Sequence, residues 1–129
     1  MLKSGILNPH INSLLARIRH TNTLVLADRG FPFWPHIETI DISLIDDIPK
    51  IPDLLRAIQQ NFVIGNIWMA EEFRQHNTTQ THADLILLTQ PLAITWEPHE
   101  TFKLRVPHAI GLIRTGDTTQ YANMILQSA

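Results

Sequence analysis

The chain has 129 residues, of which 44% are hydrophobic and 17% charged, and this composition predicts one globular domain over residues 1–129. The formal net charge of -2 excludes a strongly basic surface for nucleic acid, and the absence of cysteine excludes disulfides and thiolate chemistry. No apolar run approaches the roughly 20 residues that cross a bilayer, and the N-terminal residues lack the apolar core of a signal peptide. We therefore expect a cytoplasmic protein with no membrane partner.

The first half of the chain predicts a helix followed by a short buried strand. Asn8-Pro9 favours a helix start, because Asn caps free N–H groups and Pro suits the first helical position; the helix should end near His20. The apolar run Thr23–Ala27 is typical of a buried strand, which the polar segment 28–30 ends. The elements expected next are a strand at 37–42, a helix at 49–61 and a strand at 62–70.

The second half continues the alternation of strands and helices. Residues 74–83 are polar and rich in Thr, Gln and His, so we expect a loop or a frayed helix there, whereas Glu71-Glu72 favours a helix start. The remaining elements expected are a helix at 99–105 and strands at 94–96, 109–114 and 124–127. This alternation predicts an α/β protein with helices on the faces of a sheet.

Two polar residues bracket the first predicted strand. His20 precedes it and Asp28 follows it, and a five-residue strand spans roughly 17 Å. The two side chains therefore meet only through bends in the chain or through a neighbouring chain. Each residue also has a purely structural interpretation, His20 as a cap at the end of a helix and Asp28 as a cap of a turn.

The polar segment 114–123 lies between two apolar strands and contains a second pair of candidates. Tyr121 is the only tyrosine, and Asn123 follows two residues later. On an extended segment the two side chains project to the same face, where a phenol and an amide suit sugar hydroxyls. The alternative is an ordinary polar pair at a strand end.

Seven histidines raise the question of a metal site, but their spacing disfavours one. No HxH, HxxxH or H-E-x-x-H pattern occurs, and His76 and His82 lie in a polar segment where solvated histidines are expected. We therefore predict no metal ligands. The absence of a Gly-rich phosphate loop likewise favours a protein without a nucleotide cofactor.

Several segments, taken in order, resemble the ribose pyranase and fucose mutarotase (RbsD/FucU) family. The resemblance extends over nearly the whole chain, from residues 5–9 through 20–22 and 27–32 to the closing motif. The first three of these segments read Gly-Ile-Leu-Asn-Pro at 5–9, His-Thr-Asn at 20–22 and Ala-Asp-Arg-Gly-Phe-Pro at 27–32. The later ones read Ala-Glu-Glu at 70–72, Pro-His-Glu-Thr-Phe-Lys at 98–103, Arg-Thr-Gly-Asp at 114–117 and Tyr-Ala-Asn at 121–123. The first and last of these fit the ribose branch better than the fucose branch.

The resemblance implies a single-domain, three-layer α/β/α fold with a central mixed β-sheet. It implies that His20 is the proton donor of a sugar-ring isomerase that interconverts the pyranose and furanose forms of D-ribose, without a cofactor. It also implies a homo-oligomer, a ring-shaped pentamer or a decamer of stacked rings, with pockets shared between neighbouring subunits. The sugar-binding residues implied are Asp28, His99, Lys103, Tyr121, Ala122 and Asn123.

Some positions depart from the family pattern. Arg19 stands where the family has Gly, Asn22 where it has Asp, and Asp117 where it has Glu. Trp34 enlarges a loop that is usually smaller, and the indole is a candidate to stack on a sugar face. Two other functions remain open from the sequence: a fucose-type mutarotase, and a non-catalytic monosaccharide-binding accessory protein of sugar uptake.

Overall fold

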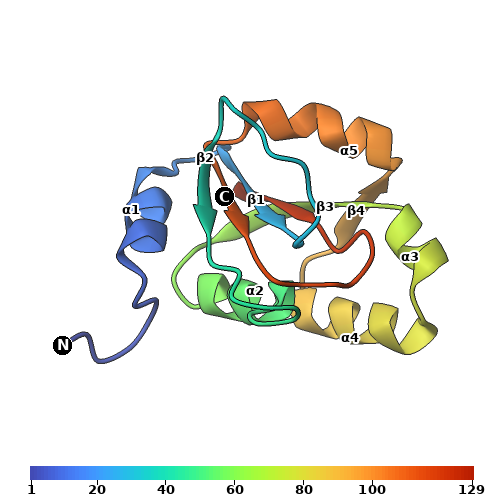
Figure 1. Cartoon of the computed structure of the whole chain (residues 1–129), viewed down its shortest axis with the longest axis horizontal. Coiled ribbons are helices and arrows are strands. Elements are labelled where there is room, and N and C mark those ends of the chain that lie inside the picture. Colours follow the sequence, from blue (N-terminus) through green and yellow to red (C-terminus); the bar gives the residue numbers. More distant parts are fainter.

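The computed structural model describes residues 1–129 and contains one six-stranded sheet (Figure 1). The strands lie in the order β2-β5-β1-β6-β3-β4; β6 is antiparallel to its neighbours β1 and β3, and the other pairs are parallel. The mixed sheet expected from the family resemblance is thus confirmed. The strand bounds are β1 Thr23–Ala27, β2 Glu38–Asp41, β3 Ile64–Ala70, β4 Ile94–Glu97, β5 Gly111–Arg114 and β6 Met124–Ser128.

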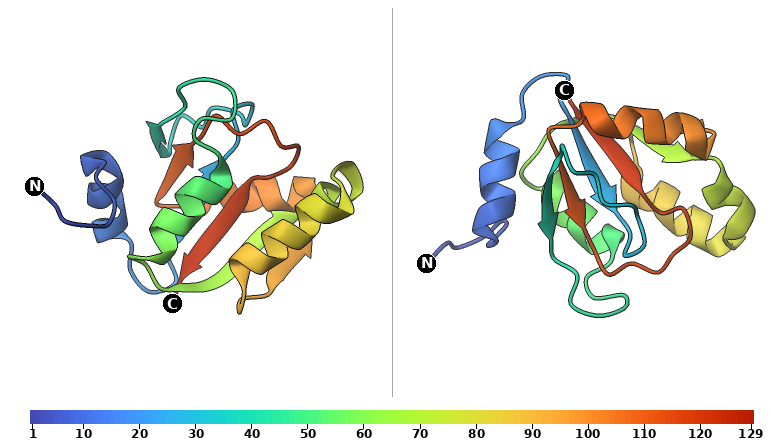
Figure 2. Two further views of the ribbon diagram at one scale, coloured as in Figure 1. Left: turned by 90° about the horizontal axis from the view of Figure 1, so that it is seen from below. Right: turned by 45° about the horizontal axis from the view of Figure 1, so that its top comes forward.

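Helices cover both faces of this sheet, as expected for a three-layer fold. Figure 2 (left) shows α2 and α4 in front of the sheet and α5 behind it. The core under α1 to α4 is separate from the smaller core under α5, which centres on the fully buried Phe102. No helix combines the length and apolar character needed to cross a membrane. The helix bounds are α1 Pro9–Arg17, α2 Ile51–Gln59, α3 Glu72–His76, α4 Thr79–Thr89, α5 His99–Arg105 and the 3-10 turn Val106–His108.

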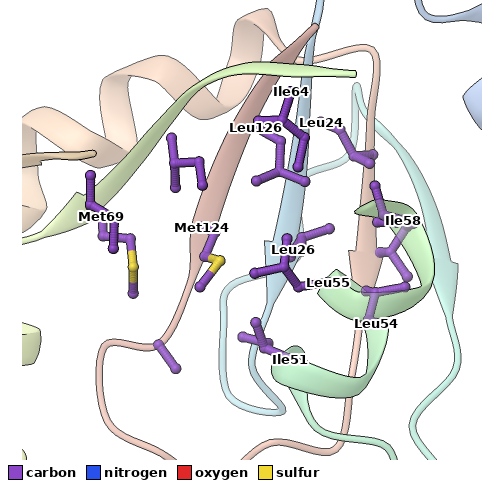
Figure 3. Close-up of a cluster of buried hydrophobic side chains, with 14 of the residues drawn as sticks. Leu24, Leu26, Ile51, Leu54, Leu55, Ile58, Ile64, Met69, Met124 and Leu126 are labelled. Atoms are coloured by element: carbon purple, nitrogen blue, oxygen red, sulfur yellow. The ribbon is translucent and has the colours of Figure 1, made fainter. Parts of the chain in front are cut away.

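The alternation of side chains along the strands separates the two cores. In β1, Leu24 and Leu26 belong to the larger core, whereas Val25 and Ala27 belong to the smaller one. Figure 3 shows the larger core, in which the apolar face of α2 packs against β1 and β6. Burying a Leu or Ile side chain contributes about 1.5–3 kcal/mol, so this face holds α2 in place. The inward residues predicted for α2, Leu54, Leu55 and Ile58, are all buried.

The start of α1 is confirmed, but its predicted end is wrong. The side chain of Asn8 accepts hydrogen bonds from the backbone N–H groups of His10 and Ile11, at 2.9 and 3.1 Å. The helix ends at Arg17, and Ile18 is already extended. His20 therefore lies in the turn between α1 and β1, so the interpretation of His20 as a helix cap is wrong.

The prediction of a loop or frayed helix over 74–83 is also wrong. This segment contains the end of α3 and the start of α4, separated by the extended Asn77. The Thr78 side chain caps α4 by accepting from the backbone N–H of Thr81 at 3.1 Å. The polar composition of this segment gives no helical pattern of apolar residues. These helices are stabilised by caps and by a few buried side chains such as Phe73 and Leu85. The expected helix start at Glu71-Glu72 is confirmed, since α3 begins at Glu72.

Candidate functional site

One edge of the sheet collects the polar residues that follow the parallel strands. Asp28 follows β1, Glu71 follows β3 and His99 opens α5 just beyond β4. Because β6 is antiparallel, Asn123, which precedes it, reaches the same edge. Ligands of α/β proteins bind at such an edge, beyond the carboxyl ends of the strands. This edge is the candidate site.

Asp28 and Asn123 form the best-defined contact of the site. The backbone N–H of Asp28 donates to Oδ1 of Asn123 at 2.8 Å, and Nδ2 of Asn123 donates to Oδ2 of Asp28 at 2.9 Å. The other carboxylate oxygen of Asp28 accepts from the backbone N–H of Gly30 at 2.9 Å. Asp28 thus caps a turn, as the structural interpretation predicted, and is also oriented by the C-terminal segment.

Burial raises the pKa of Asp28 above its ordinary value. The hydrogen bonds from Asn123 and from the turn oppose this shift, because they stabilise the carboxylate, and the nearby charge of Asp117 adds to it. Asp28 is therefore an oriented carboxyl group that is easier to protonate than an exposed aspartate. Such a group can accept a hydrogen bond from a sugar hydroxyl and can also exchange a proton.

Arg114 supports the loop behind Asp28, a role that the sequence did not suggest. Its guanidinium donates to the carbonyl oxygens of Asp28, Arg29 and Pro32 at 3.2, 3.3 and 3.4 Å. The arginine was visible in the polar segment 114–123, but nothing in the sequence indicated its partners, since they lie more than 80 residues away.

Tyr121 lies against His99, but not on the extended segment that was predicted. Its φ is 55°, so it occupies the left-handed region within a turn. The rings of His99 and Tyr121 meet edge to face at 5.2 Å between centroids. His99 stacks on Phe102, and its Nδ1 is buried without a hydrogen-bond partner. His99 as a whole is half-buried and lies at the edge where Asp28 lies, which makes it a candidate to bind a ligand hydroxyl.

Asp117 fixes the loop that carries Tyr121. The residue is 1% exposed, and its carboxylate accepts from the backbone N–H of Ile51 at 2.9 Å and of Thr119 at 2.8 Å. The first of these N–H groups opens α2, where the helix dipole favours a negative charge. The shorter acid at this position therefore still ties the loop to a helix.

The other two predicted sugar-binding residues contribute differently. Lys103 lies on α5, and its Nζ pairs with the Glu100 carboxylate at 2.8 Å; none of its contacts joins it to Asp28. Ala122 is 5% exposed as a whole residue and its side chain belongs to the larger core, so any contact with a ligand would have to come from its backbone. The structure thus brings together Asp28 and Asn123, and separately His99 and Tyr121.

His20 lies at the opposite edge of the sheet. The neighbouring Thr21 donates its backbone N–H to the carbonyl of Ser128, at the far end of β6 from Asn123. Figure 2 (right) shows the C-terminus beside the junction of α1 and β1, away from the loop that precedes β6. The His20 side chain is exposed. Within one chain, the length of β1, roughly 17 Å, therefore separates His20 from Asp28.

Two of the unusual positions have structural roles. Oδ1 of Asn22 accepts from the backbone N–H of Arg19 at 2.9 Å, so the amide closes the turn that bears His20, as a carboxylate would. Trp34 is half-buried and packs on Phe31 at 6.3 Å between ring centroids, and its Nε1 is buried without a partner. The indole therefore belongs to the core under α5.

His76 and His82, which were expected to be solvated, both contact aromatic rings. His76 is exposed, but its ring packs on Tyr121 at 5.0 Å between centroids. His82 packs edge to face on Trp96, and its Nε2 is buried. No spacing rule in the sequence relates His76 to Tyr121, so the contact between their rings was not predicted.

The structure contains no cluster of three or more His, Asp or Glu residues suited to a metal ion.

A cavity of about 270 Å³ lies behind the site, between α2, α3 and α4. Its walls include Met69, Phe73 and Met124 from the core, with Lys50 and Arg56 among the polar residues. It contains neither Asp28 nor His99. Polar residues such as Asp84 and Thr119 also line this cavity, so polarity alone does not distinguish the two places. The edge around Asp28 is the candidate site because it holds most of the residues that the family resemblance implies.

Comparisons with known proteins agree with this architecture. The D-ribose pyranase of Staphylococcus aureus (strain USA300) is 36% identical over 130 residues, covering 99% of this chain and 97% of that protein. The structure of Bacillus subtilis RbsD complexed with D-ribose matches with a TM-score of 0.91 and 36% identity, covering 100% of this chain and 98% of that one. A fucose mutarotase from Streptococcus pneumoniae, in complex with L-fucose, shares the fold with a TM-score of 0.75 and 23% identity over 99% and 98% of the two chains. The model of the RbsD / FucU transport protein family matches residues 1–129, and the chain belongs to this family.

Proposed function

We propose that this protein is a D-ribose pyranase, an enzyme that interconverts the pyranose and furanose forms of the free sugar. One observation carries the proposal: the edge of the sheet that holds the Asp28–Asn123 and His99–Tyr121 contacts belongs to a chain that matches ribose-bound RbsD over its full length. The cytoplasmic location expected from the sequence is part of the same proposal. Ribose is favoured over fucose because the likeness to the fucose mutarotase, at 23% identity, concerns the fold alone.

The reaction needs proton transfer and no redox chemistry. One proton leaves the anomeric hydroxyl and another arrives at the ring oxygen as the bond between the anomeric carbon and the ring oxygen breaks, which gives the open-chain aldehyde. Attack by a different hydroxyl then closes a ring of the other size, and the protons return. A positioned acid or base typically contributes 10²–10⁴-fold to such a step, and an imidazole works near neutral pH.

The residues divide into two sets at opposite edges of the sheet. Asp28, His99, Tyr121 and Asn123 would hold the sugar, with Lys103 and the backbone of Ala122 at the periphery. His20 would supply the proton, and the distance along β1 requires that it come from an adjoining copy. We therefore propose that each working site combines the sugar-binding edge of one subunit with His20 of the partner subunit.

This arrangement has a consequence for assembly. A contact between two different edges of the same chain can form twice in a two-fold dimer, or it can repeat head to tail and close into a ring. Either assembly would bring His20 of one subunit to the sugar-binding edge of the other. The ring-shaped pentamer or decamer implied by the family resemblance is the assembly we propose.

Saturation-transfer NMR tests the activity directly, because it measures exchange between the ring forms of ribose. We expect the protein to accelerate this exchange and His20→Ala to abolish the acceleration. Ribose binding without faster exchange would instead support the non-catalytic accessory function. Faster exchange of fucose than of ribose would support the mutarotase.

A mixing experiment tests the shared site. His20→Ala and Asp28→Ala are each expected to be inactive alone. In random co-assembly of equal amounts, about a quarter of the interfaces would join an intact sugar-binding edge to an intact His20, because each half of the site comes from the intact variant in one case out of two. Recovery of about a quarter of the wild-type activity would support the proposal. No recovery in assemblies shown to contain both variants would exclude a site shared in this way.

A further inference from the structure

A row of aromatic rings runs along the candidate site and extends beyond the residues assigned to it above. Phe102 stacks on His99, His99 meets Tyr121, and Tyr121 packs on His76, with centroid distances of 6.1, 5.2 and 5.0 Å. His76 is the last residue of α3, whose first residue, Glu72, accepts the backbone N–H of His99 with its two carboxylate oxygens at 3.0 and 3.2 Å. The planes of the His76 and Tyr121 rings are tilted by 33°, whereas His99 meets Tyr121 at 82°.

Tyr121 needs such support because its backbone is in a disfavoured conformation. Its φ of 55° places it in the left-handed region, which residues with a Cβ seldom occupy. A residue remains there only when its surroundings hold it, and such positions cluster at functional sites. The turn 119–121 alone supplies little restraint, since the hydrogen bond from the backbone N–H of Ala122 to the carbonyl of Thr119 is long, at 3.4 Å.

Asn77 supplies a second restraint from the same helix end. Its Nδ2 donates to the carbonyl of Phe73 at 2.8 Å, within α3, and to the carbonyl of Gln120 at 2.9 Å. The second bond joins the end of α3 to the residue directly before Tyr121. His76 and Asn77 thus hold both the ring and the backbone of the tyrosine, and Phe73, which is 2% exposed, anchors α3 to the core.

We propose that His76 and Asn77 are positioning residues that hold Tyr121 against His99 and so set the affinity of the site for its sugar. His76 acts through the face of its ring, so an aromatic residue should replace it. Asn77 acts through its amide. The choice of ribose as the sugar rests on the proposed function above. The restraint of Tyr121 by His76 and Asn77 is independent of that choice.

The single tyrosine of the chain permits a specific spectroscopic test. Incorporation of 3-fluorotyrosine gives one ¹⁹F signal, from Tyr121, in the complete assembled protein. We would compare the wild type with His76→Ala, His76→Phe and Asn77→Ala. His10→Ala serves as the matched control, because His10 is an exposed histidine on α1 with no aromatic partner among the ring contacts.

In the free protein, His76→Ala and Asn77→Ala should move or broaden the ¹⁹F signal, and His76→Phe should leave it sharp. Titration with ribose should show about 3- to 10-fold weaker binding for the two alanine variants, the range expected for loss of one aromatic contact in His76→Ala and of one hydrogen bond in Asn77→Ala. In exchange assays KM should rise by a similar factor, with a much smaller change in kcat. His76→Phe and His10→Ala should bind ribose as the wild type does.

Two results would overturn the inference. An unchanged ¹⁹F signal in both alanine variants would show that neither residue restrains Tyr121. Equal losses of affinity in His76→Phe and His76→Ala would show that the imidazole itself contacts the sugar and does not act through Tyr121. A wild-type protein that binds ribose without accelerating exchange would contradict the proposed enzyme activity, yet the affinities would still decide the role of His76.

Discussion

Asp28 and Asn123, 95 residues apart in the sequence, are joined by two hydrogen bonds in opposite directions. The amide oxygen of Asn123 accepts from the backbone of Asp28, and its amide nitrogen donates to the carboxylate. This contact connects the end of β1 to the start of β6, so the orientation of Asp28 depends on the C-terminal segment. The pair also opposes the rise in the pKa of Asp28 that burial causes.

Replacement of Asn123 by Ala should therefore raise the pKa of Asp28 further. The hydrogen bond from Nδ2 favours the carboxylate, so its loss leaves burial as the dominant influence, and burial favours the neutral acid. Carboxyl ¹³C NMR should show the titration of Asp28 at higher pH than in the wild type, together with weaker ribose binding. Asn66→Ala, at the other end of the sheet, is the control. A titration at lower pH would contradict this account.

Gly116 should not tolerate a side chain. A Cβ at this position would lie 2.3 Å from the carbonyl oxygen of Ile45 and 2.9 Å from that of Ile48, and both are backbone atoms that cannot rotate away. Overpacking of this kind typically costs about 1–3 kcal/mol. Urea denaturation of Gly116→Ala should show a loss in this range, with weaker sugar binding because the loop 115–123 moves.

Gly30 provides the comparison for that variant. A Cβ there would meet Oδ1 of Asp28 at 3.7 Å, which is an ordinary van der Waals distance. Gly30→Ala should therefore unfold close to the wild-type urea concentration although it lies nearer to Asp28. Equal destabilisation of the two variants would refute the steric argument.

Asp117 should be needed as a carboxylate. In Asp117→Asn, one acceptor is replaced by an N–H₂ group that faces the backbone N–H of Ile51 or Thr119, so a buried donor loses its partner. The expected loss in the free energy of unfolding is about 1–3 kcal/mol, measured with urea. Asp84→Asn, at an exposed acid on α4 whose oxygen accepts from the Gln80 side chain, is the control. Unchanged stability of Asp117→Asn would mean that the loop is held by other contacts.

Asn22→Asp tests the turn that bears His20. An aspartate can still accept the hydrogen bond from the backbone N–H of Arg19, so the turn and the thermal stability should be retained. The added negative charge favours a protonated imidazole nearby, so the pH profile of exchange should move to higher pH. Asn22→Ala, which loses the acceptor, should lower the stability without this shift. A shift to lower pH for Asn22→Asp would exclude His20 as the titrating group.

Local signals in the sequence were sufficient for most of the fold. The strand Thr23–Ala27 and the helix His99–Arg105 were predicted with their observed bounds, because a short apolar run and a helical pattern are local properties. The start of α3 was predicted from Glu71-Glu72, but the rest of α3 and the start of α4 were not, since their polar residues carry little periodic signal and their anchors are few. The left-handed backbone of Tyr121 was also missed, because the restraints on it come from α3.

The sequence by itself determined the α/β class, the absence of cysteine chemistry and the resemblance that pointed to a sugar-ring isomerase, because these depend on composition and on the order of local motifs. Only the tertiary structure decided which candidates meet. The antiparallel β6 brings Asn123 to Asp28, and a loop ahead of it brings Tyr121 to His99, whereas the length of β1 keeps His20 at the other edge. The distances between these side chains depend on the direction and register of the strands, and no local pattern in the sequence specifies direction or register.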